Sequence, residues 1–482
     1  MKKVLLINPK RTAENTSSPF PHLGLTILAT ILKNNGLSPL VLDYSFNHDA
    51  PNVRHFVREL DPDVVGVTMW TSCVDVANEV IDKVIEVKKV PIVIGGPHAT
   101  LYYQDLSGDT RMSYIVTGEA EDIVVDVMRD AEIQQKPVIV RSSTPDINKL
   151  PFPDFRLCYN YQKMTTKPIQ MSRGCPFNCS FCEVSTLSSK KVRVRDVEAC
   201  IEEIRQAKEI LPNLRQIRIV DDAPTVQIKR FIEFLKMYIG ANIGLGIYID
   251  NMRADGISEE LLDLLKQCGV SHICLGVESA NPEVFNAVDK GETLEEIEQG
   301  ATLVKKKGIP LELCFVLGLP YATYEKDLDS IKLARRLKPD WVYWNMFVPY
   351  RGTRARKWFE EHGRLFGEEG FSSLIDYNLD MDNPAVETDD YTLWERKRAW
   401  IKANLQTGTF HFRLSLMPKI IRYVIQYHLY SDFFVMLTTQ TVRKYVRNRL
   451  KYFVRGIPGA RYLYGGLHVA WKRLVVRAIA SR

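Results

Sequence analysis

The chain has 482 residues, with 64 basic and 58 acidic side chains and a formal net charge of +6. Residues 411–482 carry 14 basic residues and one acid, Asp432, whereas the other 410 residues carry 50 basic and 57 acidic side chains. An acidic body with a basic tail excludes a generally basic protein that coats nucleic acid. The 45% hydrophobic and 25% charged composition excludes disordered and fibrous proteins.

The length, the apolar runs and the cysteines of the chain further limit the class of protein to which it can belong. At roughly 150 residues per domain, the chain predicts about three domains. The apolar run after Met1-Lys2-Lys3 is too short for a signal peptide, and no uncharged stretch approaches the ~20 residues of a membrane helix. Nine cysteines in such a chain indicate reduced thiols, so we expect a cytoplasmic protein whose clustered cysteines bind metal.

Residues 1–140 predict an α/β domain with a doubly wound, Rossmann-like (flavodoxin-like) sheet. Strand patterns alternate with amphipathic helices, which is typical of a parallel sheet covered on both faces. Ligands of such sheets bind beyond the carboxyl ends of the strands, although a purely structural domain is the alternative. Strands are expected at 4–8, 40–43, 64–68 and 91–96, and helices at 23–33 and 74–88.

The remaining chain divides into a linker, a second α/β domain and a helical region. Residues 141–165 contain Pro145, Pro151 and Pro153 and predict the linker. Six strand–helix units of ~30 residues follow in 166–355, which fits a partial (β/α)6 barrel. Residues 356–482 lack strand alternation and predict a mainly helical, basic C-terminal region. The barrel strands are expected near 168–172, 215–221, 243–249, 271–277, 310–317 and 341–347, with helices near 196–210, 227–240, 258–268, 293–307 and 323–337.

The most informative motif is MSRGCPFNCSFCEV at 171–184, in which Cys175, Cys179 and Cys182 have the spacing C-x3-C-x2-C. Three thiolates on one loop can bind three irons of a [4Fe–4S] cluster and leave the fourth iron open. A zinc site would need a fourth ligand, and this loop offers none. Three ordinary buried cysteines are the other alternative, which the turn-forming Gly174, Pro176 and Asn178 disfavour.

This spacing, with Phe181 before the third cysteine, resembles the radical S-adenosylmethionine (SAM) superfamily. The resemblance implies that the open iron binds SAM and that an electron from a flavodoxin or ferredoxin yields a 5′-deoxyadenosyl radical. It also implies that groups at the barrel strand ends contact SAM, although Tyr321-Ala322-Thr323 and Tyr350-Arg351 depart from the usual motifs. The expected SAM contacts are Phe181, Asp221, Asp222, Glu278, Ser279 and Gly318.

The first 140 residues resemble the cobalamin-binding domain that precedes the barrel in one radical SAM subgroup, so the resemblance implies cobalamin as a further cofactor. The Asp-x-His motif of other cobalamin proteins is absent, because Ser45 stands two residues after Asp43. We therefore expect no protein histidine on cobalt. His98 is a candidate substitute ligand, but we favour its interpretation as a loop histidine hydrogen-bonded to the backbone. The expected cobalamin contacts are Thr68, Thr71, Ser72, Gly95, Gly96 and Gly118.

The resemblance leaves several reactions open. We favour a C-methyltransferase acting on an unactivated carbon of a lipid, tetrapyrrole or natural-product-like substrate, over an oxidative cyclase or ring rearrangement without methyl transfer. An RNA methylthiotransferase would need three N-terminal cysteines, and only Cys73 precedes the linker. A catalytically silent cofactor carrier is disfavoured by the intact cysteine motif.

The basic tail offers two further alternatives. Its cations alternate with large apolar groups, which is typical of segments lying on an anionic membrane surface. The alternative is a helical domain whose apolar face packs on the barrel. The apolar and aromatic groups of the tail are Ile420-Ile421, 433–437, 452–454, Tyr462, Tyr464, Trp471 and 474–476.

Overall fold

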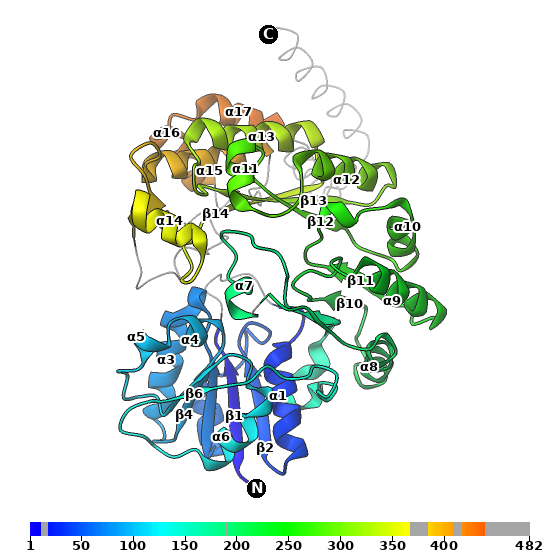
Figure 1. Ribbon diagram of the computed structural model, residues 1–482. Helices are drawn as coiled ribbons and strands as arrows, with labels where there is room; N and C mark the ends of the chain where they lie inside the picture. The colour runs from blue at the N-terminus through cyan, green and yellow to red at the C-terminus, as the bar shows by residue number, and fades with distance from the viewer. Residues whose placement is uncertain (11–17, 189, 367–383, 408–416, 439–482) are drawn as a thin grey trace, which may run out of the picture. The chain divides into compact units, whose positions relative to one another are not determined.

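The computed structural model describes residues 1–10, 18–188, 190–366, 384–407 and 417–438. They fall into two compact units, Met1–Lys397 and Arg398–Arg482. The first unit contains the two α/β regions that the sequence predicts (Figure 1).

The N-terminal region is built on a six-stranded sheet of order β2-β1-β3-β4-β5-β6, in which every pairing is parallel. This flavodoxin-like order confirms the predicted doubly wound fold. Sequence analysis found four of these strands and missed β5 and β6, which are short and lack a continuous buried run. The strands are β1 (Lys3–Asn8), β2 (Ser38–Asp43), β3 (Val64–Thr68), β4 (Ile92–Gly95), β5 (Tyr114–Thr117) and β6 (Val138–Arg141).

Helices cover both faces of this sheet, because successive side chains of its strands point to opposite sides. In β1, Leu5 and Ile7 join one hydrophobic core, whereas Val4 and Leu6 join the other. The first core packs against α2 (Val53–Leu60), α3 (Val74–Ile85), α4 (Pro97–Leu101) and α5 (Tyr103–Leu106). The second packs against α1 (Leu23–Asn34) and α6 (Val124–Asp130) (Figure 1).

The segment predicted as a linker packs along the first domain. Phe155, Cys158 and Met164 are buried in the same core as α1. Cys158 Sγ also lies 3.3 Å from the hydroxyl of Thr26. The segment forms two short turns of helix, η3 (Phe155–Leu157) and η4 (Tyr161–Lys163).

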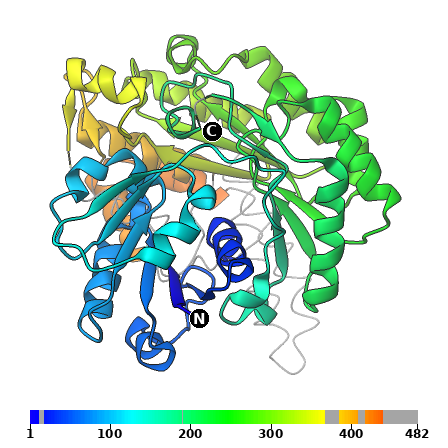
Figure 2. The same ribbon diagram turned by 60° about the horizontal axis from the view of Figure 1, so that its bottom comes forward.

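Six parallel strands then form the predicted partial barrel (Figure 2). They pair as two three-stranded ladders, β7-β10-β11 and β12-β13-β14. Single bridges, Ile247–Val270 and Met252–Leu275, connect the ladders. The strands are β7 (Thr166–Ile169), β10 (Gln216–Ile219), β11 (Gly246–Ile249), β12 (Ile273–Glu278), β13 (Leu311–Leu317) and β14 (Trp341–Met346).

Amphipathic helices cover the outer face of the barrel strands (Figure 1). Side-chain caps start the last four of them: Thr293, for example, forms a capping box with Glu296 at the start of α12. The helices are α8 (Val197–Ile210), α9 (Ile228–Gly240), η5 (Ala254–Gly256), α10 (Glu259–Gln267), α11 (Pro282–Val288), α12 (Leu294–Lys306) and α13 (Tyr324–Leu337).

The described C-terminal residues are mainly helical, as predicted. None of the helices described is long and apolar enough to cross a membrane. The predicted tail groups 452–454, Tyr462, Tyr464, Trp471 and 474–476 lie outside the described residues. The elements are α14 (Arg354–His362), β15 (Arg364–Leu365), β16 (Val386–Glu387), α15 (Leu393–Thr407), α16 (Met417–Gln426) and α17 (Tyr430–Thr438).

Candidate functional site

The three motif cysteines lie on a loop that a small hairpin closes at its base. The hairpin pairs β8 (Ser172–Arg173) with β9 (Arg193–Val194), and a short helix, α7 (Val184–Leu187), follows the third cysteine. Gly174 has a φ of +96°, and a Cβ there would lie 2.1 Å from the carbonyl oxygen of Lys191. Only glycine therefore lets the two sides of the loop approach this closely.

Cys175, Cys179 and Cys182 are each half-buried. Burial, with a smaller contribution from neighbouring cysteines, raises the pKa of Cys179 to about 11 and that of Cys182 to about 12. The three thiols are thus close enough to influence one another. Such a group suits a metal centre, because iron displaces the protons and neutralises the clustered thiolate charge.

Asp221 and Asp222, which follow β10, hold the base of the cysteine loop. Asp221 accepts hydrogen bonds from the amide of Met171, at 2.7 Å, and from the hydroxyl of Ser172, at 2.5 Å. Asp222 accepts one from the amide of Gly174, at 2.7 Å. Burial raises the pKa of both carboxyls, that of Asp221 to about 7. Their direct role in the structure is to orient the loop, and SAM contact by either residue stays a prediction.

Glu278 belongs to a buried ionic group at the end of β12. It occupies a bulge with a φ of +64°, and its carboxylate lies 3.5 Å from the ammonium of Lys290. Lys290 also pairs with Glu292 at 2.9 Å and lowers the pKa of Cys179, against the larger effect of burial. Lys290 was not predicted from the sequence. The only feature that could have indicated it is its position in the turn after α11.

The remaining expected SAM contacts, Phe181, Ser279 and Gly318, differ in their burial and in their hydrogen-bond partners. Phe181 is half-buried, and Ser279 is buried, with its hydroxyl accepting a hydrogen bond from the amide of Asn281. The carbonyl of Gly318 accepts a hydrogen bond from Arg396 at 2.7 Å, and a Cβ at Gly318 would lie 2.2 Å from that guanidinium. In this structure, the absence of a side chain at Gly318 therefore lets the buried guanidinium of Arg396 lie against the backbone.

A cavity of about 1010 Å³ opens at the carboxyl end of the N-terminal sheet. This volume is at the upper end for small-molecule sites and suits a large cofactor such as a corrinoid. The sheet side includes Thr68, Ser72, Gly95, Gly96 and Gly118, which are five of the six expected cobalamin contacts. The barrel side includes Gln170, Arg173, Glu183, Arg218, Asp250 and Tyr350.

Thr71, the sixth expected contact, is absent from the described cavity lining. Its hydroxyl lies 3.3 Å from Nδ1 of His98, whose ring stacks on Tyr102. Burial lowers the pKa of His98 to about 4, so this histidine is neutral near pH 7. His98 lies in α4 rather than in a loop, and its ring faces the Thr71 side chain rather than the backbone, so our interpretation of its surroundings was wrong in both respects.

An ionic latch joins the loop after β5 to the cysteine hairpin. We define the latch as Glu119, Glu121, Arg173 and Arg193. Arg173 lies 2.5 Å from Glu119 and 2.7 Å from Glu121, and Arg193 pairs with Glu119 as well. Since Glu119, Glu121 and Arg173 also line the cavity, the latch fixes its two walls relative to each other.

Comparison with known proteins matches both domains. The profile described as the radical SAM superfamily matches residues 169–334, and that of the B12 binding domain matches residues 11–128. The chain is a radical SAM protein with a B12-binding domain. Its cofactors are accordingly a [4Fe–4S] cluster, SAM and cobalamin, and the cysteine loop and the cavity have the donors and the space that these groups need.

The relatives of this radical SAM protein carry out more than one reaction. The chain is 28% identical to the anaerobic magnesium-protoporphyrin IX monomethyl ester cyclase of Rubrivivax gelatinosus, over 72% of this chain and 68% of the relative. It is 26% identical to the hopanoid C-3 methylase of Methylococcus capsulatus, over 71% and 69%. The radical SAM methyltransferase TsrM from Kitasatospora setae shares the fold, with a TM-score of 0.60 at 18% identity, over 74% of this chain and 75% of TsrM.

Proposed function

We propose that this protein is a cobalamin-dependent radical SAM C-methyltransferase acting on an unactivated carbon of a lipid, tetrapyrrole or natural-product-like molecule. When bound, the cluster, SAM and cobalamin supply a carbon-centred radical and a transferable methyl group. The observation that carries the proposal is that one cavity is lined by both the sheet ends and residues beside the cysteine loop. A substrate carbon between those walls would be accessible to both reagents.

The roles of individual residues follow from their contacts. Cys175, Cys179 and Cys182 would hold the cluster, while Asp221 and Asp222 keep the loop closed around it. Thr68, Ser72, Gly95, Gly96 and Gly118 would contact cobalamin at the sheet edge. Glu278, Ser279, Phe181 and Gly318 are proposed on the SAM side, and Thr71 would act through His98.

Transfer of an isotopic label tests the reaction. The reconstituted protein is incubated with SAM carrying a CD3 methyl group, a reductant and an extract of polycyclic lipids and tetrapyrroles. Methylation predicts a product that has gained CD3, together with 5′-deoxyadenosine and S-adenosylhomocysteine. Labelled product formed equally by a Cys175→Ala variant would contradict the radical mechanism.

An oxidative cyclase is the second candidate, because the Rubrivivax relative named as a cyclase is 28% identical to this chain. A cyclase would consume SAM as an oxidant and leave the label out of the product. Deoxyadenosine with an unlabelled, ring-closed product would therefore replace the first proposal by the second.

We also propose a cytoplasmic location, a one-electron donor of the flavodoxin or ferredoxin type, and contact with the membrane surface through the C-terminal unit. Ile421 and Ile425 are 44% and 55% exposed on one face of α16, and Phe434 on α17 is 61% exposed. Lys419 and Arg422 on α16 add positive charge beside these apolar groups. Apolar and basic groups together favour an anionic lipid surface.

A further inference from the structure

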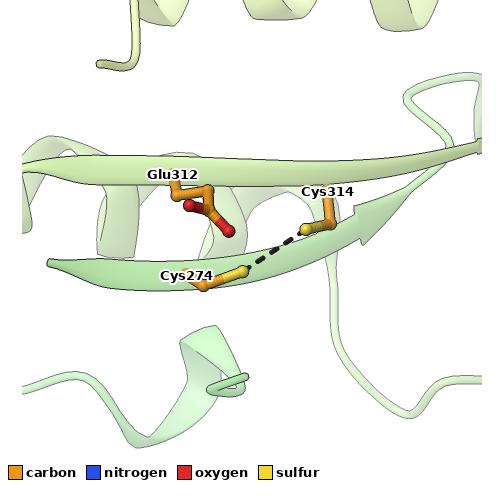
Figure 3. A group of neighbouring side chains, drawn as sticks. All are labelled: Cys274, Glu312 and Cys314. Atoms are coloured by element: carbon orange, nitrogen blue, oxygen red, sulfur yellow. Dashed lines mark hydrogen bonds between the residues drawn. The ribbon is translucent and has the colours of Figure 1, made fainter. Parts of the chain in front are cut away.

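The inside of the barrel contains a group of metal-ligating side chains outside the cluster loop. Cys274 lies on β12, and Glu312 and Cys314 lie on β13. Their ligand atoms all lie within 4.8 Å of one another. The two sulfurs are 3.3 Å apart, and the three side chains point into one space between the strands (Figure 3).

The strand register explains why these residues meet. Cys274 pairs with Glu312, and Gly276 pairs with Cys314. Cys314 and Cys274 are therefore diagonal neighbours on one face of the paired strands, and their sulfurs meet at 3.3 Å. Leu311, Leu313 and Phe315 alternate with Glu312 and Cys314 and are fully buried, so they occupy the opposite face of β13.

A histidine lies beside this group, although its ring nitrogens are not within 4.8 Å of all three ligand atoms. His272, two residues before Cys274, is only 6% exposed, and its Nε2 atom has no hydrogen-bond partner among the described residues. That atom lies 3.7 Å from the carboxylate of Glu312, so it points at the group. A buried ring nitrogen without a partner costs free energy unless something binds it.

The contacts around His272 orient it as a ligand. Its Nδ1 lies 2.9 Å from the hydroxyl of Ser271, which can accept a hydrogen bond from Nδ1–H and so leave the lone pair of Nε2 for a metal. The rings of Tyr248 and Trp341 pack edge-on against the imidazole, with centroids 4.5 and 6.0 Å away. A hydrogen bond from the second ring nitrogen, as Nδ1 can form here, is typical of metal-binding histidines.

We propose that Cys274, Cys314, Glu312 and His272 form a binding site for a divalent metal, Zn²⁺, separate from the iron–sulfur cluster. Two thiolates, an imidazole and a carboxylate match the ligand preference and the tetrahedral geometry of zinc. With Zn–S bonds of about 2.3 Å, a tetrahedron has an S···S edge of about 3.8 Å, and its N···O edge is about 3.4 Å. The spacings of 3.3 Å and 3.7 Å lie within small side-chain adjustments of these values.

Metal analysis of the full-length protein tests the site. The protein is reconstituted anaerobically with iron and sulfide, equilibrated with Zn²⁺ and desalted, and zinc and iron are measured separately. The parent should retain about one zinc per chain, and a Cys274→Ser/Cys314→Ser variant should lose it while keeping its cluster iron. A Cys200→Ser/Cys268→Ser variant, which changes two other buried cysteines of the barrel domain, should retain the zinc.

A second measurement keeps the proposal testable if the double variant does not fold. Co²⁺ bound to a Cys175→Ala/Cys179→Ala/Cys182→Ala background should give thiolate-to-cobalt charge-transfer bands and tetrahedral d–d bands. Loss of a residue that only supports a ligand typically weakens metal binding about 10–100-fold. Because His272 is a proposed ligand, His272→Ala in this background should weaken Co²⁺ binding by at least as much. Absence of these bands, equal zinc in the Cys274→Ser/Cys314→Ser variant, or a Cys274–Cys314 disulfide found by mass spectrometry would each overturn the proposal.

Discussion

Gly174 is the residue at which the cysteine loop tolerates a side chain least. A Gly174→Ala substitution must move the backbone at Lys191 and occupy a φ of +96°, a strain of order 1–3 kcal/mol. We expect cluster iron after reconstitution to fall severalfold. Gly108→Ala is the matched control, because a Cβ there meets nothing within 4 Å, and it should retain full iron. Equal iron in both variants would contradict the role of Gly174.

Asp221 should make stability depend on pH. Burial raises its pKa from 3.8 to about 7, so the folded state holds this proton more tightly than the unfolded chain does. The resulting stabilisation is complete below the unfolded pKa and is lost as the pH rises through about 7. Because Asp221→Asn cannot ionise, its melting temperature should rise relative to that of the parent as the pH increases from 3.8 through about 7, and the difference should then level off. If the melting temperatures of the two apo-proteins, measured by circular dichroism, change with pH in the same way, this assignment is refuted.

The sequence predicted the site residues whose signal is local. Cys175, Cys179 and Cys182 were recognisable because their ligand spacing lies within one loop. Arg173 and Glu119 were missed, because their pairing is created by the fold across 54 residues. Thr71 was expected to line the cavity, but sequence could not show that its hydroxyl faces His98 instead.

At the scale of elements, the ionic latch joins the β5 loop to the cysteine hairpin. Glu119→Gln leaves Arg173 and Arg193 partly unpaired in surroundings where their side chains are only 15% and 18% exposed. We expect the free energy of unfolding to fall by about 1–3 kcal/mol, measured by urea titration. The control variant, Glu79→Gln, removes an ion pair whose acid is 65% exposed. It should change the free energy of unfolding by less than about 0.5 kcal/mol. Similar losses for both variants would show that the latch adds nothing beyond a surface pair.

Helices α16 and α17 carry the membrane proposal. An Ile421→Glu/Phe434→Glu variant removes two exposed apolar groups, each worth up to about 1.5–3 kcal/mol if buried in lipid. Cosedimentation with phosphatidylserine-containing vesicles should therefore weaken at least tenfold. Ile133→Glu, at a residue 61% exposed in the first unit, is the control and should bind as the parent does. If the double variant and the control bind equally, α16 and α17 are not the membrane contact.

At the scale of the whole molecule, hydrophobic periodicity was sufficient to predict the order and the type of most helices and strands. It placed all six barrel strands and the alternating helices, because buried parallel strands read as apolar runs. It missed β6, whose residues are mostly exposed, and it treated 141–165 as a linker although Phe155 and Cys158 are buried in the first domain. Such long-range packing has no local signature in the sequence.

The central claim is that one cavity brings SAM and cobalamin to the same substrate carbon for a radical methyl transfer. Its most direct test is the product balance of the full-length protein, reconstituted with iron, sulfide and hydroxocobalamin and supplied with SAM, reductant and substrate extract. The account predicts 5′-deoxyadenosine and S-adenosylhomocysteine in equal amounts per methylated product, both abolished in Cys175→Ala. Continued SAM cleavage to deoxyadenosine by Cys175→Ala, or methylation without cobalamin, would contradict it.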